Sequence, residues 1–329
     1  MFNSNSLFLM TMVLSTVMVI SSETWLGVWM GLEMNMISFI PIMYESKNTA
    51  SSESCMIYFI VQSLGSVLML ISALLDPFFM VPPTMESEPY NTMIMLSMMI
   101  KLGMPPFHFW FPEILEKMKW NKCFLLMSWQ KIAPMWIISY VMNSPILMFT
   151  IILAVIVGAI GGLNQTSLRK VMGYSSISHM GWLIACLAYN YDYWVVYMIL
   201  YAGMIWLLIM MFNQYSAYFI NQMINSSPSY MEKLLITISL LSFGGLPPFI
   251  GFLPKLLVIQ SMIDNLIVTL IMMMTTLITL FYYLRIISSC FLIYSSSIKW
   301  HTSKKLQPML IMLMFTFHFS LPVIAMFSF

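Results

Sequence analysis

The chain has 329 residues, of which 60% are hydrophobic and only 8% are charged, and its mean hydropathy is +0.87. A soluble globular enzyme carries roughly 25% charged residues, so this composition excludes that class, and it also excludes a disordered chain. The net charge of +2 comes from 14 basic and 12 acidic residues, which are too few and too dispersed for a nucleic-acid interface. The composition therefore predicts an integral membrane protein.

Hydropathy and helix-breaking residues predict eleven transmembrane helices, because each span needs roughly 20 apolar residues. In chain order they cover residues 3–20, 24–43, 55–75, 90–115, 123–142, 145–163, 168–188, 193–214, 231–263, 265–293 and 307–328. Two of them, 90–115 and 231–263, are longer than one straight crossing requires, and Gly-x-Pro-Pro interrupts both. We expect each to be a single crossing made by a broken helix. Segments 76–90 and 215–230 match no pattern and are assigned no function.

The distribution of charged residues in the loops supports eleven spans, with both long segments counted as single crossings. One side of the membrane then holds ten basic residues and the other holds none; the ten are Lys47, Lys117, Lys119, Lys122, Arg169, Lys170, Lys233, Lys299, Lys304 and Lys305. The opposite loops hold Glu23, Asp76, Glu86, Glu88, Asp192 and Asp264. Counting either long segment as two spans would move a basic cluster to the acidic side. The positive-inside rule therefore predicts the N-terminus on the basic side and the C-terminus on the other.

The two broken spans contain an internal repeat. Residues 103–113 (GMPPFHFWFPE) and 245–255 (GLPPFIGFLPK) are identical at five of eleven positions, including Gly103/Gly245, Pro105/Pro247 and Pro106/Pro248. The spans lie five crossings apart, and an odd offset implies opposite orientations in the membrane. We expect one membrane domain, residues 1–329, with approximate inverted repeats 1–142 and 145–293 followed by a helix at 307–328. Many transporters have their ion sites at paired helix breaks, although such prolines can also merely kink a structural helix.

Four charged residues fall inside the predicted spans: Glu33, Lys101, Lys131 and Lys255. Counted from their span ends, Glu33 and Lys131 lie roughly 12–14 Å deep, close to the middle of the hydrocarbon core. A basic residue at a helix centre costs about 2.5–3.5 kcal/mol. Lys101 and Lys255 flank the Pro-Pro breaks, where backbone groups released from the helix must face protein or water.

The buried charges suggest a proton relay. Burial disfavours the charged form of a lysine and a nearby carboxylate favours it, so lysines with movable neighbours can gain and lose protons. We expect Glu33 to pair with Lys101, and Lys101, Lys131 and Lys255 to form a lateral relay. Static ion pairs that hold helices together are the structural alternative, but three lysines for one glutamate argue against simple pairing. His108 in the first break and His179 within a span could extend a water wire, or could be satisfied by neighbouring serines. No metal site is expected.

Several long motifs carry a family resemblance. They are Lys101-x-Gly-x-x-Pro-Phe-His-Phe-Trp-x-Pro-Glu, Trp129-Gln-Lys131-x-Ala-Pro134, GAIGGLNQTSLRK at 158–170, Tyr174-Ser-Ser-Ile-x-His179-x-Gly-Trp182 and Gly244-Gly-Leu-Pro-Pro-Phe-x-Gly-Phe-x-Pro-Lys255. With Trp25-Leu-Gly-x-Trp-Met-Gly-Leu-Glu33 they cover essentially the whole chain. The sequence resembles the chain 2 family of mitochondrial NADH:ubiquinone oxidoreductase, an antiporter-like membrane-arm subunit of respiratory complex I in its short animal form.

The resemblance implies a function for the buried charges. In that family the residues matching Glu33, Lys101, Lys131 and Lys255 are regarded as the proton-translocating elements. The resemblance also implies that NADH, FMN, iron–sulfur clusters and ubiquinone are bound elsewhere in the complex and none in this chain. It further implies other membrane-arm subunits and lipids as partners rather than a stand-alone monomer, no nucleic acid, and the mitochondrial inner membrane with the basic side facing the matrix. A stand-alone or Mrp-type cation/proton antiporter and a structural membrane scaffold are the alternatives.

Overall fold

The structure is a computed structural model that describes residues 4–46, 48–75, 88–141, 146–189, 193–225, 229–263, 265–292 and 308–321. Within these ranges the chain is helical, and its only β-type pairing is an isolated antiparallel bridge between Ser167 and Phe219. The expectation of an all-α protein is confirmed. The predicted sidedness also depends on Lys47, Asp76, Glu86, Asp192, Asp264, Lys299, Lys304 and Lys305, which lie outside the described residues, as does 322–328 of the last predicted span.

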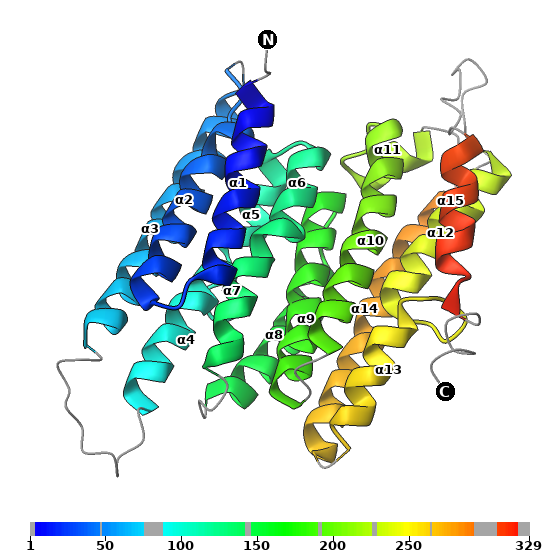
Figure 1. The fold of residues 1–329 in the computed structure, drawn as a ribbon. Helices are drawn as coiled ribbons and strands as arrows, with labels where there is room; N and C mark the ends of the chain where they lie inside the picture. Colours follow the sequence, from blue (N-terminus) through cyan, green and yellow to red (C-terminus); the bar gives the residue numbers. More distant parts are fainter. Residues whose placement is uncertain are drawn as a thin grey trace. The chain divides into compact units, whose positions relative to one another are not determined.

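The helices follow the chain in the order shown in Figure 1. They are α1 (Ser4–Ser21), α2 (Trp25–Met43), α3 (Thr49–Leu75), α4 (Glu88–Leu102), α5 (Trp110–Lys117), α6 (Trp120–Met127), α7 (Trp129–Tyr140), α8 (Ile146–Gly162), α9 (Leu168–Tyr189), α10 (Tyr193–Gln214), α11 (Ile220–Asn225), α12 (Tyr230–Gly244), α13 (Phe252–Ser261), α14 (Leu266–Leu292) and α15 (Pro308–His318).

The outer surfaces of the helices are apolar. Among the described helices, α2, α3, α9, α10 and α14 are long and apolar enough to cross a membrane. In α3 the buried positions are mostly small or polar, such as Ser54, Gln62 and Gly65, whereas Phe59 and Leu64 are exposed. Lipid is as apolar as leucine, so membrane helices associate through small and hydrogen-bonding residues instead. The chain is therefore built to be surrounded by lipid.

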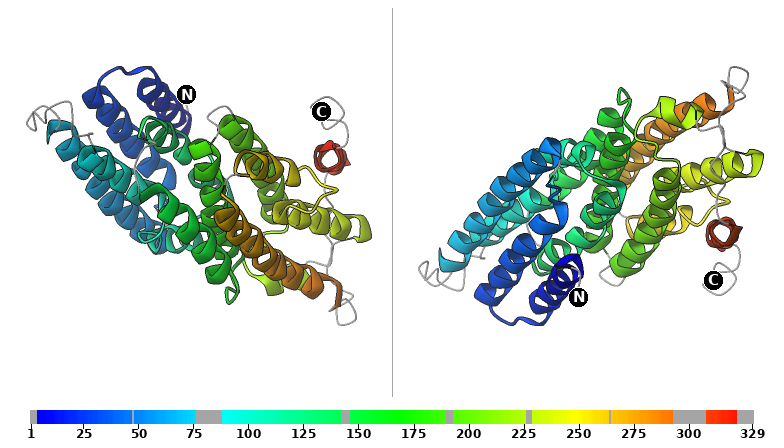
Figure 2. Two further views of the ribbon diagram at one scale, coloured as in Figure 1. Left: turned by 90° about the horizontal axis from the view of Figure 1, so that it is seen from below. Right: turned by 90° about the horizontal axis from the view of Figure 1, so that it is seen from above.

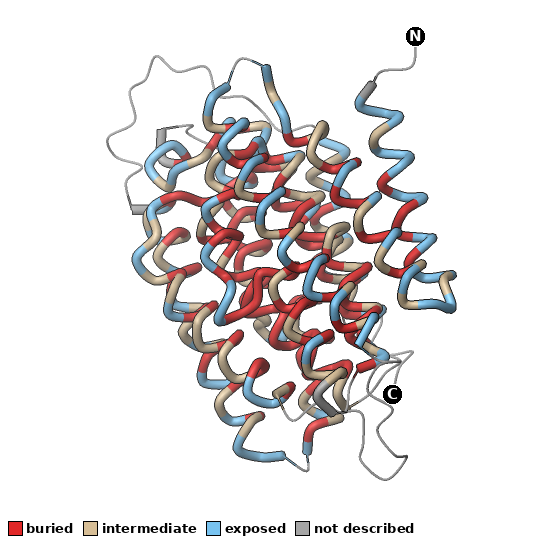
Figure 3. Tube along the Cα trace, turned by 90° about the vertical axis from the view of Figure 1, so that its left-hand side faces the viewer, coloured by how far each residue is buried: buried red, intermediate tan, exposed pale blue. Residues whose placement is uncertain are grey.

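Contacts divide the chain into two compact units, Met1–Thr150 (unit 1) and Ile151–Phe329 (unit 2). In unit 1, α2, α3 and α4 lie side by side, and α7 packs against α1 and α4 (Figures 1 and 2). In unit 2, α12 packs against α10, α14 and α15, while α13 packs against α9 and α10. Buried positions concentrate on the helix faces that meet their neighbours, and exposed positions lie on the outer turns (Figure 3).

Both Gly-x-Pro-Pro motifs follow the end of a helix and share the geometry of the cap at the glycine, whereas a cis peptide bond is found at Pro105–Pro106 and not at Pro247–Pro248. α4 ends before Gly103 and α12 before Gly245, and both glycines have positive φ angles, 68° and 83°. The next residue in each case donates its backbone N–H five residues back, Met104 to Met99 and Leu246 to Leu241. This is the glycine-terminated helix cap, in which glycine is favoured because it has no Cβ. The prolines that follow cannot continue the helix, because they have no N–H.

One interruption was not expected from the sequence. The predicted span 123–142 consists of two helices, α6 and α7, separated at Ser128, whose φ and ψ are −110° and −69°. The Ser128 hydroxyl donates to the carbonyl of Phe124 at 2.6 Å. Lys131 lies three residues beyond this irregular position, so a helix end precedes it as well.

Candidate functional site

Lys101 occupies the last turn of α4, immediately before the first break. Its side chain is 5% exposed and lies over Gly65 of α3, where an added Cβ would be 2.8 Å from the Lys101 Cγ. The carbonyl of Lys101 is one of those that the end of α4 leaves without a helical partner, and Gln62 Nε2 donates to it at 3.0 Å. Helix α3 thus fixes both the backbone and the stem of this lysine.

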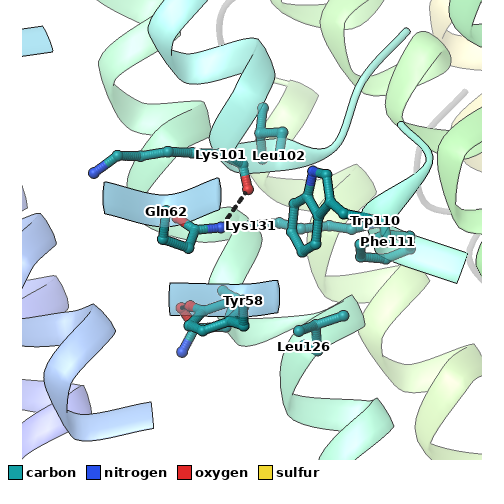
Figure 4. Close-up of a pocket in the computed structure, with 9 residues that line it drawn as sticks. Tyr58, Gln62, Lys101, Leu102, Trp110, Phe111, Leu126 and Lys131 are labelled. Carbon is teal, nitrogen blue, oxygen red and sulfur yellow. Dashed lines mark hydrogen bonds between the residues drawn. The ribbon is translucent and has the colours of Figure 1, made fainter. Parts of the chain in front are cut away.

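Lys131 lies on α7 and is 2% exposed. Its ammonium is 5.6 Å from the centre of the Phe111 ring, which belongs to α5 beyond the first break. Figure 4 shows Lys131 beside Trp110 and Phe111, whereas the Lys101 ammonium points away from Trp110. The first break therefore brings two buried lysines to one region of unit 1.

Two small cavities occupy this region, each with room for about one water molecule. Four residues line both cavities: Tyr58, Gln62, Lys101 and Gln130. Lys131 lines the first cavity only, together with Trp110 and Phe111 (Figure 4). The second cavity extends to the α2 residues Leu32, Asn35 and Met36.

A chain of uncharged polar groups crosses the same region. Tyr58 donates its hydroxyl to Gln130 Oε1 at 3.3 Å, and Gln130 Nε2 donates to Asn35 Oδ1 at 3.2 Å and to Met12 Sδ at 3.3 Å. The sequence motifs did not predict a role for these residues. The sequence feature that could have pointed to them is the presence of glutamine and asparagine within apolar spans, where such residues usually hydrogen-bond between helices.

Glu33 is arranged differently from the expected ion pair. Its side chain on α2 is partly exposed, and its carboxylate acts on Lys101 electrostatically. The ion pairs found among the described residues join loop and helix-end groups, and none of them joins Glu33 to Lys101. Direct pairing with Lys101 is therefore not observed, and the attraction between the two opposite charges acts without contact.

Lys255 lies on α13 at the second break, in unit 2, and is 6% exposed. Its ammonium donates to the carbonyl of Gly244 at 2.7 Å and lies 5.9 Å from the centre of the Trp182 ring. Gly244 is the last residue of α12, and the negative end of a helix dipole attracts a cation there. The stem covers Gly245, where a Cβ would be 2.8 Å from both Cδ and Nζ.

The two histidines predicted as relay candidates lie near different breaks, His108 at the first and His179 near the second. His108 Nδ1 is 3.3 Å from the carbonyl of Pro106, and the residues lining the two cavities do not include His108. His179 Nδ1 is 2.9 Å from the Tyr197 hydroxyl, and its ring packs edge-on against Phe243 near the end of α12. The expected partner of His179 was a serine, whereas the partner in this contact is Tyr197.

A third histidine, His318, lies outside the motifs that the sequence singles out. Its side chain is fully buried at the end of α15, and neither ring nitrogen has a hydrogen-bond partner among the described residues. Its carbonyl accepts from Ile250 N–H at 3.2 Å, which attaches α15 to the second break. Among the described residues no group of three or more histidine, cysteine, aspartate or glutamate side chains could hold a metal ion.

An ionic cluster in unit 1 joins the loop after α2 to the start of α6, outside the predicted spans. Lys122 donates to Glu45 at 2.6 Å and to the carbonyl of Met43 at 2.9 Å, and Lys119 is 3.0 Å from the other Glu45 oxygen. Burial acts to raise the pKa of the Glu45 carboxyl, but the hydrogen bonds and charges of Lys122 and Lys119 outweigh burial and hold this pKa below its usual value of 4.5.

We expect Glu45→Gln to lower the thermal midpoint of the extracted protein at pH 7, by an amount corresponding to roughly 1 kcal/mol for a surface cluster. Because the folded pKa of Glu45 is lowered, its stabilising effect is present above pH 4.5 and is lost as the pH falls through the folded value. The difference between wild type and variant should therefore shrink at acid pH. The exposed Glu23, changed to glutamine, is the control. A difference that is constant with pH would contradict this assignment.

Comparisons with known proteins agree with this architecture. Residues 22–280 match the family described as NADH:quinone oxidoreductase/Mrp antiporter, TM. NADH-ubiquinone oxidoreductase chain 2 of Locusta migratoria is 42% identical over 327 residues, which cover 98% of this chain and 93% of the locust protein. The same chain of Oryctolagus cuniculus is 37% identical over 305 residues, 89% of this chain and 85% of the rabbit protein.

A solved structure shows the same fold. A chain of respiratory complex I from Thermus thermophilus with bound aureothin superposes with a TM-score of 0.82 at 19% identity, and the match covers 94% of this chain and 75% of that one. At this identity the likeness concerns the fold alone. The curated relatives and the family match together show that this chain belongs to the NADH-ubiquinone oxidoreductase chain 2 family, within the NADH:quinone oxidoreductase/Mrp antiporter membrane proteins.

Proposed function

We propose that this chain is a proton-translocating core subunit in the membrane arm of respiratory complex I. It takes part in NADH:ubiquinone oxidoreduction as a member of that assembly. One observation carries the proposal: two buried lysines, Lys101 and Lys131, line one water-sized cavity beside a helix break. Burying a lysine near a membrane centre is costly, and a purely structural scaffold would gain nothing from that cost.

The proton relay consists of Glu33, Lys101, Lys131 and Lys255. A desolvated ammonium readily releases its proton to a neighbouring water, and a change in a nearby charge can reverse that preference. Glu33, which acts on Lys101 electrostatically, is the group in unit 1 suited to such control. His108 and His179 are secondary relay candidates beside the two breaks. The helix-break residues Gly103, Pro105, Pro106, Gly245, Pro247 and Pro248 provide the non-helical backbone that this chemistry needs.

The proposed topology has eleven crossings. In it, α4 with α5 form one broken crossing, and α12 with α13 form another. The repeats 1–142 and 145–293 have opposite orientations, and the last crossing is 307–328. The N-terminus faces the basic side, which is the matrix side of the mitochondrial inner membrane. The ten-to-none distribution of basic loop residues supports this orientation.

Electron transfer belongs to other subunits in this proposal. NADH, FMN, iron–sulfur clusters and ubiquinone are bound elsewhere in the complex, and this chain contributes no redox group. Its partners are the neighbouring membrane-arm subunits and lipids. A Mrp-type cation/proton antiporter is the second candidate, because the matching family description includes both kinds of protein.

A native gel of a mild-detergent membrane extract tests the proposal. We expect an antibody against this chain to detect a very large species that also stains for NADH dehydrogenase activity in the same lane. Migration as a small species without that activity would contradict membership in complex I and favour an independent antiporter.

A further inference from the structure

We infer that Tyr58 is a further proton-relay residue, whose hydroxyl connects the cavity beside Lys131 to the cavity that reaches α2. This inference rests on the proposed function, because it supplies a step within the relay of unit 1. It is carried by the position of Tyr58 between the two cavities and by the hydrogen bond to Gln130.

The tyrosine ring is fixed by its surroundings. Tyr58 is 2% exposed, and its ring packs edge-on against Phe39 at 5.2 Å and against Trp110 at 6.2 Å between ring centres. Phe39 belongs to α2, and Trp110 begins α5 beyond the first break. With the ring held on both sides, rotation about the C–O bond is the movement left to the polar end of this side chain.

The cavity linings give Tyr58 its place in the path. The first cavity reaches Lys131 and the second reaches Asn35, two residues along α2 from Glu33. Of the four residues common to both cavities, Gln62 and Gln130 carry amides, which do not titrate. Lys101 and Tyr58 are the shared residues that can carry a proton, and Tyr58 can pass one on without changing its own charge.

The hydrogen bonds set the resting direction of the Tyr58 hydroxyl. Gln130 Nε2 donates to Asn35 and Met12, which leaves Gln130 Oε1 to accept from Tyr58. In a transfer, the O–H turns from Gln130 Oε1 toward a water in one cavity and passes its proton to it, while the phenol oxygen accepts a proton from a protonated water in the other cavity. The O–H bond then turns back to Gln130 Oε1. One proton has crossed: the donor water has lost an O–H bond, the acceptor water has gained one, and the phenol oxygen has formed one and broken one, so the tyrosine stays neutral.

Two substitutions separate a relay from a packing role. Tyr58→Phe keeps the ring and removes the hydroxyl, whereas Tyr58→His disturbs the ring packing but supplies a group that can relay protons. A relay predicts more proton translocation with histidine than with phenylalanine, and a packing role predicts the reverse. Tyr140→Phe is the matched control, because this tyrosine is in the same unit and is 62% exposed.

The test measures protons moved per NADH oxidised in membrane vesicles that contain the whole complex, normalised to assembled enzyme on a native gel. We expect Tyr58→Phe to lose as much of this ratio as Lys131→Met, Tyr58→His to keep part of it, and Tyr140→Phe to match wild type. A wild-type ratio in Tyr58→Phe with a loss in Lys131→Met would overturn the role of Tyr58 and leave the proposed function intact. Equal losses with phenylalanine and histidine would also overturn it. A wild-type ratio in Lys131→Met as well would contradict the proposed function itself.

Discussion

Replacing Lys131 with methionine is expected to stop proton translocation through this chain without destabilising the fold. A positioned proton donor or acceptor contributes a factor of about 100 or more to a transfer step, so its loss should reduce the flux at least that far. Methionine preserves an unbranched stem of similar length in this buried position, which is 2% exposed. Because a central buried lysine costs about 2.5–3.5 kcal/mol, removing its charge should leave the stability unchanged or higher.

The combination of lost transport and retained stability is the informative result for Lys131. Transport is measured as proton uptake in vesicles that contain the complex, and stability as the thermal midpoint of the extracted enzyme. Lys119→Met is the control, since this lysine is 65% exposed in a loop and should leave transport unchanged. If Lys131→Met unfolded the chain, the lysine would instead have a structural role, as in a static buried pair.

Gly245→Ala is expected to damage the second break more than a single added methyl group usually would. Gly245 has a φ of 83°, and a non-glycine residue in that conformation costs roughly 1–2 kcal/mol. The new Cβ would lie 2.8 Å from Lys255 Cδ and Nζ and would push the ammonium off the Gly244 carbonyl. A buried carbonyl left without a donor costs about 1–3 kcal/mol. Together these effects would destabilise the chain by roughly 2–5 kcal/mol.

A second substitution at the same position separates the two contributions. Asparagine tolerates positive φ better than alanine, but it also carries a Cβ that meets Lys255. Gly245→Asn should therefore recover part of the stability and little of the transport. The measurements are the amount of assembled complex and the proton flux per complex. Gly27→Ala, in the first turn of α2, is the control. Full transport in Gly245→Asn would show that the position of Lys255 does not matter.

The sequence predicted the two helix ends at the Gly-x-Pro-Pro motifs because their cause is local. Proline lacks the N–H that a helix needs, and glycine adopts the positive φ of the cap. The interruption at Ser128 has no such local signal, since serine is common within membrane helices. Its unusual backbone angles are visible only in the folded chain.

The candidate site was predictable in its charges but not in its contacts. Counting residues gives the depth of Glu33 and Lys131 in the membrane, because each helical residue advances 1.5 Å. It does not give the direction in which a side chain points around the helix axis, which depends on packing between helices. The expected direct pair of Glu33 with Lys101 therefore did not appear, and the grouping of Tyr58 with Gln130 from separate helices was not foreseen.

The internal repeat also fails to predict where the charged side chains lie. Gly103 and Gly245 share one cap geometry, yet the lysine precedes the glycine by two positions in the first copy and follows it by ten in the second. The residue aligned with Lys255 is Glu113, which pairs with Lys117 on an exposed surface. The same helix cap at the two breaks thus accompanies differently placed charges.

Substitution of Gly65 is expected to disturb this site although Gly65 itself carries no ionisable group. The stem of Lys101 fills the space that a side chain at Gly65 would occupy. A change of Gly65 to serine or alanine would leave every acid and base of the chain in place, and would still displace a buried ammonium. Inherited variation at such a glycine would be classed as conservative by residue type, although its effect would fall on the energy-converting step.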